Sequence, residues 1–265
     1  MSGRVGAITP GPTFASLSDV GKVRPHNEDF VGDPLSMAPL VGDRAPTSRL
    51  GWLFAVADGM GGHAAGEVAS RVAVEALFSS YYSSEEDPRR AFDRAMAAAN
   101  EAVRWAGLGT VDLDSPRSRM GTTLVAAVVE GQKLLVANVG DSRAYLLADG
   151  SFLQITQDHS IITEQVRLGL LTAHEARRAP LRNVITRALG STEDSEPDVF
   201  ELPWATRRTL LLCSDGLHGV VEDRAIEAIL AAEPPARAVR RLIDAANAAG
   251  GPDNISTIVI RAGGA

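Results

Sequence analysis

Apolar residues recur with a helical period in two stretches near the first third of the chain. From Gly66 the rows are Val68, Val72, Ala76 and Ala69, Ala73, Leu77; after Asp87-Pro88 the row is Phe92, Met96, Ala99, Val103. Aspartate is a favoured helix N-cap, and proline suits the first helical position. The spacing therefore predicts two consecutive amphipathic helices that form one layer.

Shorter apolar runs rich in β-branched residues predict strands over much of the remaining chain. These runs are Thr13 to Asp19, Leu53 to Ala57, Thr123 to Val129, Leu134 to Val139, Ala144 to Leu147, Phe152 to Ile155, Val199 to Leu202, Thr209 to Cys213 and Ile255 to Ile260. Gly21 to Asp29 is interpreted as an irregular polar segment that ends in Phe30-Val31. The four runs between Thr123 and Ile155 are interpreted as one antiparallel meander, with Asp149-Gly150 as a plain hairpin turn.

Two further helices are predicted before the last strand, at Asp223 to Ala231 and Pro235 to Ala248. The second should bury Val239, Leu242, Ile243 and Ala246. Paired helices, a block of strands, paired helices and a final strand predict an α+β fold, a four-layer α-β-β-α sandwich of two antiparallel sheets. A charged insert at about 164–184, with two short helices, interrupts the strands and is interpreted as a flap.

Composition narrows the class of protein. With 265 residues, of which 45% are hydrophobic, the chain is expected to form one domain over residues 1–265. A formal charge of -7 disfavours nucleic acid and anionic membranes as partners. No apolar run is long enough to span a membrane, and the single cysteine, Cys213, is interpreted as a core residue in a reducing compartment. We therefore expect a cytoplasmic protein.

Carboxylates stand at the ends of several predicted strands. Asp58 follows Leu53 to Ala57, Asp141 follows Leu134 to Gly140, Asp215 follows Thr209 to Ser214, and Asp253 precedes the last strand. For any one Asp-Gly pair a tight turn is the ordinary interpretation. Four acids brought to one sheet edge would repel one another without cations between them.

The candidate ligands are oxygens, and no Cys/His cluster has zinc spacing, which favours hard cations such as Mg²⁺ or Mn²⁺. Two such ions can activate an oxygen nucleophile and polarise a phosphoryl group. Arg24 has the planar fork needed to hold two phosphate oxygens; the alternative for Arg24 is a surface ion pair with Glu28.

Seven short motifs occur in one order along almost the whole chain, from about Phe14 to Ile260. They are Arg24-Pro25-His26-Asn27-Glu28-Asp29, Asp58-Gly59-Met60-Gly61-Gly62-His63, Gly121-Thr122-Thr123, Val139-Gly140-Asp141-Ser142-Arg143, Gln157-Asp158-His159, Ser214-Asp215-Gly216-Leu217 and Gly251-Pro252-Asp253-Asn254. In this ordered set the sequence resembles the metal-dependent protein serine/threonine phosphatases of the type-2C family, in their bacterial form.

The resemblance implies a centre of two Mn²⁺ or Mg²⁺ ions. It makes Asp58 the bridging ligand, Asp215 and Asp253 ligands of the first ion, and the Gly59 carbonyl a ligand of the second. Glu28 and Asp29 would serve the second ion directly or through water, and which of them contacts metal stays open. Asp141 matches a ligand of a third, weaker ion.

The resemblance also implies the roles of the remaining residues. Arg24 matches the phosphate-binding arginine, and the flap is linked to substrate choice. His63 is the candidate proton donor, although three residues separate it from Asp58-Gly59, whereas histidine follows that pair directly in the animal branch. A structural role for His63 and a metal-bound water as donor are the alternatives. His159 is interpreted as a structural hydrogen-bonding residue.

The function that the resemblance implies is hydrolysis of phosphoserine and phosphothreonine in proteins by a metal-activated water, in opposition to a bacterial Ser/Thr kinase. Phosphorylated proteins are the expected partners, and a monomer is the expected state. Two alternatives stay open: a catalytically silent binding module that kept the fold, and a hydrolase of small phosphate esters or diesters.

Overall fold

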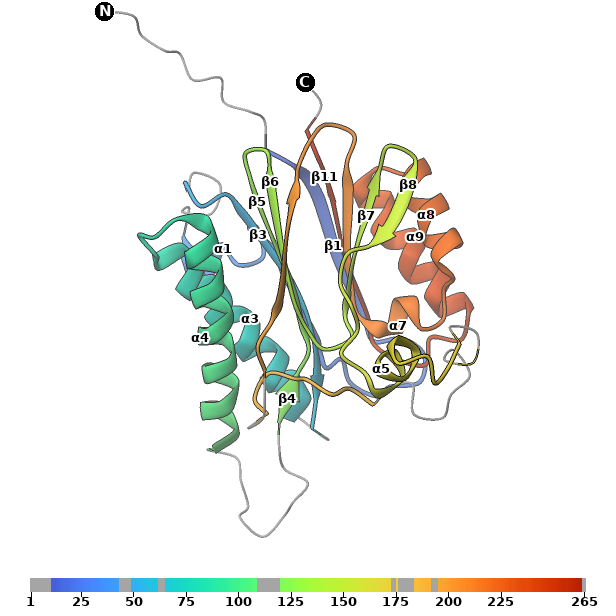
Figure 1. Ribbon diagram of the computed structural model, residues 1–265, viewed down its shortest axis with the longest axis horizontal. Helices are drawn as coiled ribbons and strands as arrows, with labels where there is room; N and C mark the ends of the chain where they lie inside the picture. The colour runs from blue at the N-terminus through green and yellow to red at the C-terminus, as the bar shows by residue number, and fades with distance from the viewer. Residues whose placement is uncertain are drawn as a thin grey trace, which may run out of the picture.

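The computed structural model describes residues 11–42, 49–61, 65–108, 120–172, 175, 184–191 and 195–263. Two antiparallel sheets lie face to face, and helices cover the outer face of each (Figure 1). The α+β fold of four layers predicted from the order of elements is confirmed.

The first sheet has the strand order β1-β11-β10-β7-β8, and the second has the order β2-β3-β5-β6-β9, with β4 paired to β3. The strands of the first sheet are β1 (Thr13–Asp19), β11 (Ile255–Arg261), β10 (Thr209–Cys213), β7 (Arg143–Ala148) and β8 (Ser151–Gln154). Those of the second are β2 (Asp29–Gly32), β3 (Trp52–Met60), β4 (Gly121–Thr122), β5 (Leu124–Glu130), β6 (Lys133–Val139) and β9 (Asp198–Pro203). Every described pair of neighbouring strands is antiparallel.

Helices α3 (Ala65–Ser83) and α4 (Pro88–Leu108) pack on the second sheet, and α8 (Asp223–Ala232) and α9 (Pro235–Ala248) pack on the first. The sequence of strand β3 is almost uniformly apolar because both faces of the strand are buried. Leu53 and Ala55 face the α3–α4 layer, whereas Phe54 and Val56 face the other sheet. Since successive side chains of a strand point to opposite faces, a strand in an inner layer must be apolar on both.

The helix patterns are confirmed with one correction. Phe92, Met96, Ala99 and Val103 are all buried, as are Ala69, Ala73 and Leu77. The row that begins at Val68 was wrongly predicted as buried, because Val68 is 41% exposed. The buried face of α3 runs through Val74, Phe78 and Tyr81 instead. The Asp87 cap is confirmed, since Asp87 Oδ1 accepts hydrogen bonds from the backbone of Arg89 and Arg90.

The predicted meander is wrong. Strands β5 and β6 form a hairpin in the second sheet, and β7 and β8 form a hairpin in the first. Between them Gly140, with a φ of 106°, turns the chain from one sheet to the other. The hairpin turn is confirmed: Asp149 and Gly150 both have positive φ, 52° and 77°.

Three short helices lie outside the main layers: α1 (Ala38–Val41), α5 (Ile161–Arg167) and α7 (Asp215–His218). Helices α1 and α7 were not predicted. In the flap, the first helix begins at Ile161, earlier than expected, because Ser160 caps it by accepting from the Thr163 backbone. The second flap helix falls mostly outside the described residues.

The two ends of the sandwich differ. The beginning of β1 and the end of β11 lie at one end, whereas α5, α7 and β4 lie at the other (Figure 1). Cys213 is fully buried in the core, and burial raises the pKa of its thiol, as expected of a packing residue.

Among the described residues, none of the helices is both long enough and apolar enough to cross a membrane.

Candidate active site

Asp58 is placed by two threonines at the end of β3. Thr123 Oγ1 accepts from the Asp58 backbone N at 3.0 Å, and Thr122 Oγ1 donates to the Asp58 carbonyl at 2.9 Å. Both backbone groups are thereby satisfied, and the carboxylate is left to face a pocket. Asp58 lies inside β3 rather than after it, directly opposite Asp29 of β2.

Gly59 allows the start of α3 to approach β3. A Cβ on Gly59 would lie 2.0 Å from the carbonyl oxygen of Gly66, so a side chain has no room there. The Gly59 N–H donates to the Glu28 carbonyl at 3.1 Å, and Ser70 Oγ donates to the same carbonyl at 2.6 Å. The segment that carries Glu28 is therefore fixed to both β3 and α3.

Asp141 sits on the turn between the two sheets, and two histidines hold that turn. His159 Nδ1 accepts from the Gly140 N–H at 3.2 Å, and His218 Nε2 donates to the Asp141 carbonyl at 3.0 Å. A Cβ on Gly140 would lie 2.6 Å from the Thr123 side chain. The structural role predicted for His159 is confirmed.

Asp215 and Asp253 meet because α7 packs on the start of β11. A Cβ on Gly216 would lie 1.9 Å from the Asn254 carbonyl oxygen, which permits only glycine at the first turn of α7. Strands β10 and β11 are paired, and the Ser214 N–H extends the ladder by donating to the Ser256 carbonyl at 3.1 Å. The chain segments that carry the two carboxylates are therefore adjacent.

Asn254 has a role that the sequence reasoning missed. Its Oδ1 accepts from the Glu28 N–H at 2.8 Å, and its Nδ2 donates to the carbonyls of Val20 and His26 at 3.0 and 2.9 Å. The side-chain amide of Asn254 thus hydrogen-bonds to both ends of the loop that carries Arg24, at Val20 and at His26 and Glu28. The signal in the sequence was an amide directly after a candidate ligand, in Gly-Pro-Asp-Asn.

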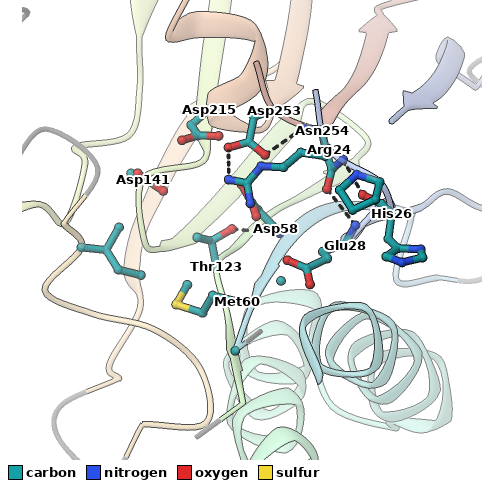
Figure 2. Close-up of a pocket in the computed structure, with 14 residues that line it drawn as sticks. Arg24, His26, Glu28, Asp58, Met60, Thr123, Asp141, Asp215, Asp253 and Asn254 are labelled. Carbon is teal, nitrogen blue, oxygen red and sulfur yellow. Dashed lines mark hydrogen bonds and ion pairs between the residues drawn. The ribbon is translucent and has the colours of Figure 1, made fainter. Parts of the chain in front are cut away.

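These elements enclose a pocket of about 550 Å³ (Figure 2). Of the predicted site residues, those that line it are Arg24, Glu28, Asp58, Gly59, Asp141, Asp215 and Asp253. Asp29 does not line the pocket: it is 6% exposed, and its Oδ2 accepts from Ser214 Oγ at 2.7 Å. Glu28 therefore faces the pocket and Asp29 lies beneath it. His63 lies outside the described residues.

Arg24 is half exposed, and its Nη2 donates to Asp253 Oδ2 at 2.7 Å. Its partner is thus not the nearby Glu28, so a local surface ion pair with Glu28 is not the observed arrangement. The hydrogen bond to Asp253 raises the pKa of Arg24. Figure 2 shows the guanidinium turned toward Asp253.

The carboxylates are held in an environment that opposes their charge. Burial raises the pKa of Asp29 and of Asp141 to about 7 and that of Asp215 to about 6. The pKa of Asp58 is raised well above its usual value, by burial first and then by the charges of Asp29 and Asp215. Two buried oxygens, Asp29 Oδ1 and Asp215 Oδ1, have no hydrogen-bond partner. Buried carboxylates of this kind call for a cation.

The donor set fits hard divalent cations. The candidate ligands in the pocket are carboxylate and carbonyl oxygens, which suit Mg²⁺ and Mn²⁺. Among the described residues, no group of three or more His, Cys, Asp or Glu side chains could by itself hold a metal ion as the side chains stand. The carboxylates instead line a shared open pocket, which leaves room for water and a phosphoryl group beside an ion.

Comparisons with known proteins identify the family of this chain. The family model described as Protein phosphatase 2C matches residues 44–258. The serine/threonine phosphatase stp of Listeria innocua is 36% identical over 249 residues, which cover 92% of this chain and 93% of that protein. The serine/threonine protein phosphatase PstP of Mycobacterium tuberculosis is 38% identical over 93% of this chain and 44% of its own length.

Solved structures of serine/threonine phosphatases have a fold similar to that of this chain. The crystal structure of the M. tuberculosis phosphatase PstP/Ppp has a TM-score of 0.81 and 37% identity, with 94% of this chain and 98% of that chain covered. A structure of the PstP catalytic domain in complex with two manganese ions has a TM-score of 0.78 and 36% identity, over 94% of this chain and 97% of that chain.

The fold and the pocket are therefore those of a metal-dependent phosphatase, and the chain belongs to the protein phosphatase 2C family. Its identification from the ordered motifs as a bacterial-type protein serine/threonine phosphatase is confirmed.

Proposed function

We propose that the chain hydrolyses phosphoserine and phosphothreonine in proteins with a water activated by two divalent cations. The observation that carries this proposal is the convergence of five carboxylates and one arginine in a single pocket of about 550 Å³. The similarity to a PstP structure that holds two manganese ions supports the proposal of a divalent-metal centre.

The proposed ligand roles are those that the family resemblance implies, applied to the residues that line the pocket. Asp58 would bridge both ions, Asp215 and Asp253 would hold the first, and the Gly59 carbonyl and Glu28 would hold the second. Asp29, which lies beneath the pocket and accepts from Ser214, would serve the second ion through water. Asp141 would bind a third, weaker ion. Bound ions supply Lewis acidity and lower the pKa of water.

Arg24 would bind the substrate phosphate. Its guanidinium carries two parallel N–H groups that match two phosphate oxygens, and its half-exposed position lets it move between Asp253 and a substrate. There it would neutralise charge that develops on the phosphoryl oxygens during in-line attack. His63 remains the proposed donor of the proton to the leaving alkoxide.

We extend the proposal to the setting of the reaction. Residues 1–265 would form one catalytic domain with its flap at about 164–184, and the protein would act as a cytoplasmic monomer that opposes a Ser/Thr kinase. The net charge of -7 favours protein rather than nucleic-acid substrates.

Asp58→Asn tests the proposal. The variant should lose at least about a hundredfold in Mn²⁺-dependent turnover of a phosphothreonine peptide, because the bridging charge is gone. Asp149→Asn, in the hairpin turn, is the matched control and should turn over normally. Chelator-treated wild type should be inactive and recover with Mn²⁺.

Three outcomes would overturn the proposal in whole or in part. Undiminished turnover by Asp58→Asn would remove Asp58 from the site. If the wild type released no phosphate from any substrate with Mn²⁺, the chain would be a silent binding module, and faster cleavage of a diester than of the phosphopeptide would make it a diesterase.

A further inference from the structure

A second cavity, of about 730 Å³, adjoins the catalytic pocket. The two share Arg24, Asp141, Asp215 and Asp253, so the second cavity is continuous with the site of phosphate binding. Its volume lies within the roughly 300–1,000 Å³ typical of ligand sites. It is bounded by α5, by the end of the β7–β8 hairpin and by the segment between α7 and α8.

Two walls of this cavity are aliphatic. Ile162 and Val166 come from α5, and Val220 and Val221 come from the segment after α7. Val166 and Val220 are partly exposed and offer most of the apolar surface to the methylene groups of a ligand, whereas Ile162 and Val221 are each 7% exposed. Such a surface beside a phosphate site suits the side chains that flank a phosphoresidue in a peptide.

Both arginines that line the cavity are already paired, Arg24 with Asp253 and Arg143 with Asp158. Arg143 donates to both oxygens of Asp158, at 2.8 and 2.6 Å, and to the Tyr145 hydroxyl at 2.7 Å. A guanidinium held by a bidentate carboxylate has little remaining capacity for an anion. Arg143 therefore does not prepare the cavity for acidic ligands.

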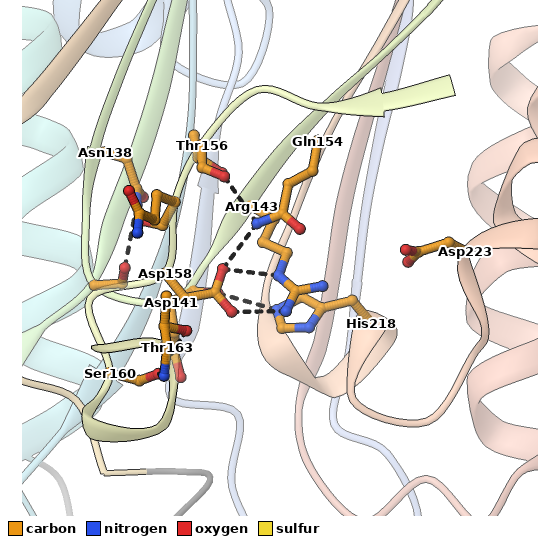
Figure 3. Close-up of polar contacts among 12 residues, drawn as sticks. Asn138, Asp141, Arg143, Gln154, Thr156, Asp158, Ser160, Thr163, His218 and Asp223 are labelled. Carbon is orange, nitrogen blue, oxygen red and sulfur yellow. Dashed lines mark hydrogen bonds and ion pairs between the residues drawn. The ribbon is translucent and has the colours of Figure 1, made fainter. Parts of the chain in front are cut away.

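Two carboxylates remain uncompensated at the start of α8. Glu222 and Asp223 are exposed, line the cavity, and form no ion pair within the described part of the chain. Asp223 accepts only a long hydrogen bond, 3.3 Å, from the Tyr145 hydroxyl. Figure 3 shows Asp223 apart from Asp158, Ser160 and Thr163, beyond Arg143 and His218. The free charge of this cavity is therefore negative.

We propose that this cavity binds the substrate segment beside the phosphoresidue and selects phosphopeptides that carry a lysine or arginine there. The aliphatic stem of such a side chain fits against Val220 and Val221, and its cationic head reaches Glu222 and Asp223. This inference rests on the proposed phosphatase activity and adds the class of substrate. Peptides with acidic flanks meet repulsion at the same place.

The test uses phosphothreonine peptides that are identical except for one flanking residue. That residue is lysine or glutamate, placed in turn at each of the three positions on either side of the phosphothreonine. We expect the wild type with Mn²⁺ to prefer lysine by about tenfold in kcat/KM at its best position, mainly through KM, because two attractions replace two repulsions. The preference should shrink in high salt.

The variant E222Q/D223N should bring the lysine-to-glutamate ratio close to one. The ratio is internal to each variant, so a general loss of activity does not change it. E222Q alone, at an exposed position before α8, should remove part of the preference for lysine over glutamate. If the double variant folds poorly, this single variant is used for the test instead. The control E75Q/E101Q removes two exposed acids from α3 and α4 and should keep the wild-type ratio.

The outcomes separate the two proposals. If the wild type hydrolyses p-nitrophenyl phosphate but shows no preference between the peptides, or if E222Q/D223N keeps the preference, this inference is wrong and the proposed function stands. If neither the small ester nor any peptide is hydrolysed, the proposed function itself fails.

Discussion

The space between the two sheets and the pocket at their edge are both buried, yet they are built in opposite ways. Between the sheets the contacts are hydrophobic, with Phe54, Leu212 and Ile260 all fully buried. At the edge, Asp29, Asp141 and Ser214 are buried with little or no exposure, and two carboxylate oxygens lack partners. Burial contributes stability in the first region and lowers it in the second.

This difference indicates how the site is maintained. Carboxylates that repel one another would separate if their backbone were free to move. Here each is fixed by other contacts: Asp58 by Thr122 and Thr123, and the Asp141 turn by His159 and His218. The interior supplies the stability that lets the edge keep its charges together.

The largest expected effect on stability is in the interior. Ile260→Ala should lower the free energy of unfolding by about 2–5 kcal/mol, because it leaves a cavity between the sheets far from the pocket. Urea denaturation measures the loss. Turnover per folded molecule should stay normal, and a large fall in kcat without unfolding would show that the two regions are not separable.

Asn254→Ala should lower kcat/KM by about ten- to a hundredfold, or about 1.4–2.7 kcal/mol, since it frees the loop that carries Arg24 and Glu28. The matched control is Asn100→Ala in α4, which removes the side-chain oxygen that accepts a hydrogen bond from the Gly190 N–H. An Asn254 variant with normal kinetics but reduced stability would assign the amide to folding alone.

Asp215→Asn should act in opposite directions on stability and activity. Without metal it should stabilise the fold by about 1–2 kcal/mol, because one of several mutually repelling buried charges is removed. With Mn²⁺ the wild type should gain more stability than the variant. Urea titrations with chelator and with Mn²⁺ measure both, and a chelated variant less stable than wild type contradicts the repulsion argument.

The smallest expected effect concerns Asp198, at the start of β9. Partial burial would raise its pKa, but hydrogen bonds and charge from His159 and Arg187 lower it overall. A lowered pKa in the folded state gives stability that is present above about pH 4 and lost as the pH falls further. Asp198→Asn should therefore be less stable at pH 7, by well under 1 kcal/mol since the side chains of Asp198 and Arg187 are 39% and 40% exposed. Near pH 3 the variant should be indistinguishable from wild type.

The ordered motifs and the periods of apolar residues predicted the layers, most strands and the four long helices. They did so because helix and strand periods are local properties of the sequence. The placement of Asp58, Asp141, Asp215 and Asp253 near strand ends likewise came from the sequence, and the structure brings all four to one pocket.

The tertiary structure decided what local spacing cannot encode. It placed the β5–β6 and β7–β8 hairpins in different sheets, set Glu28 at the pocket with Asp29 beneath it, and gave Arg24 a partner 229 residues away. It also revealed the hydrogen bonds of the Asn254 amide and the second cavity. Strand pairing between sheets and contacts between distant loops depend on packing free energies summed over the whole fold, which no short stretch of sequence contains.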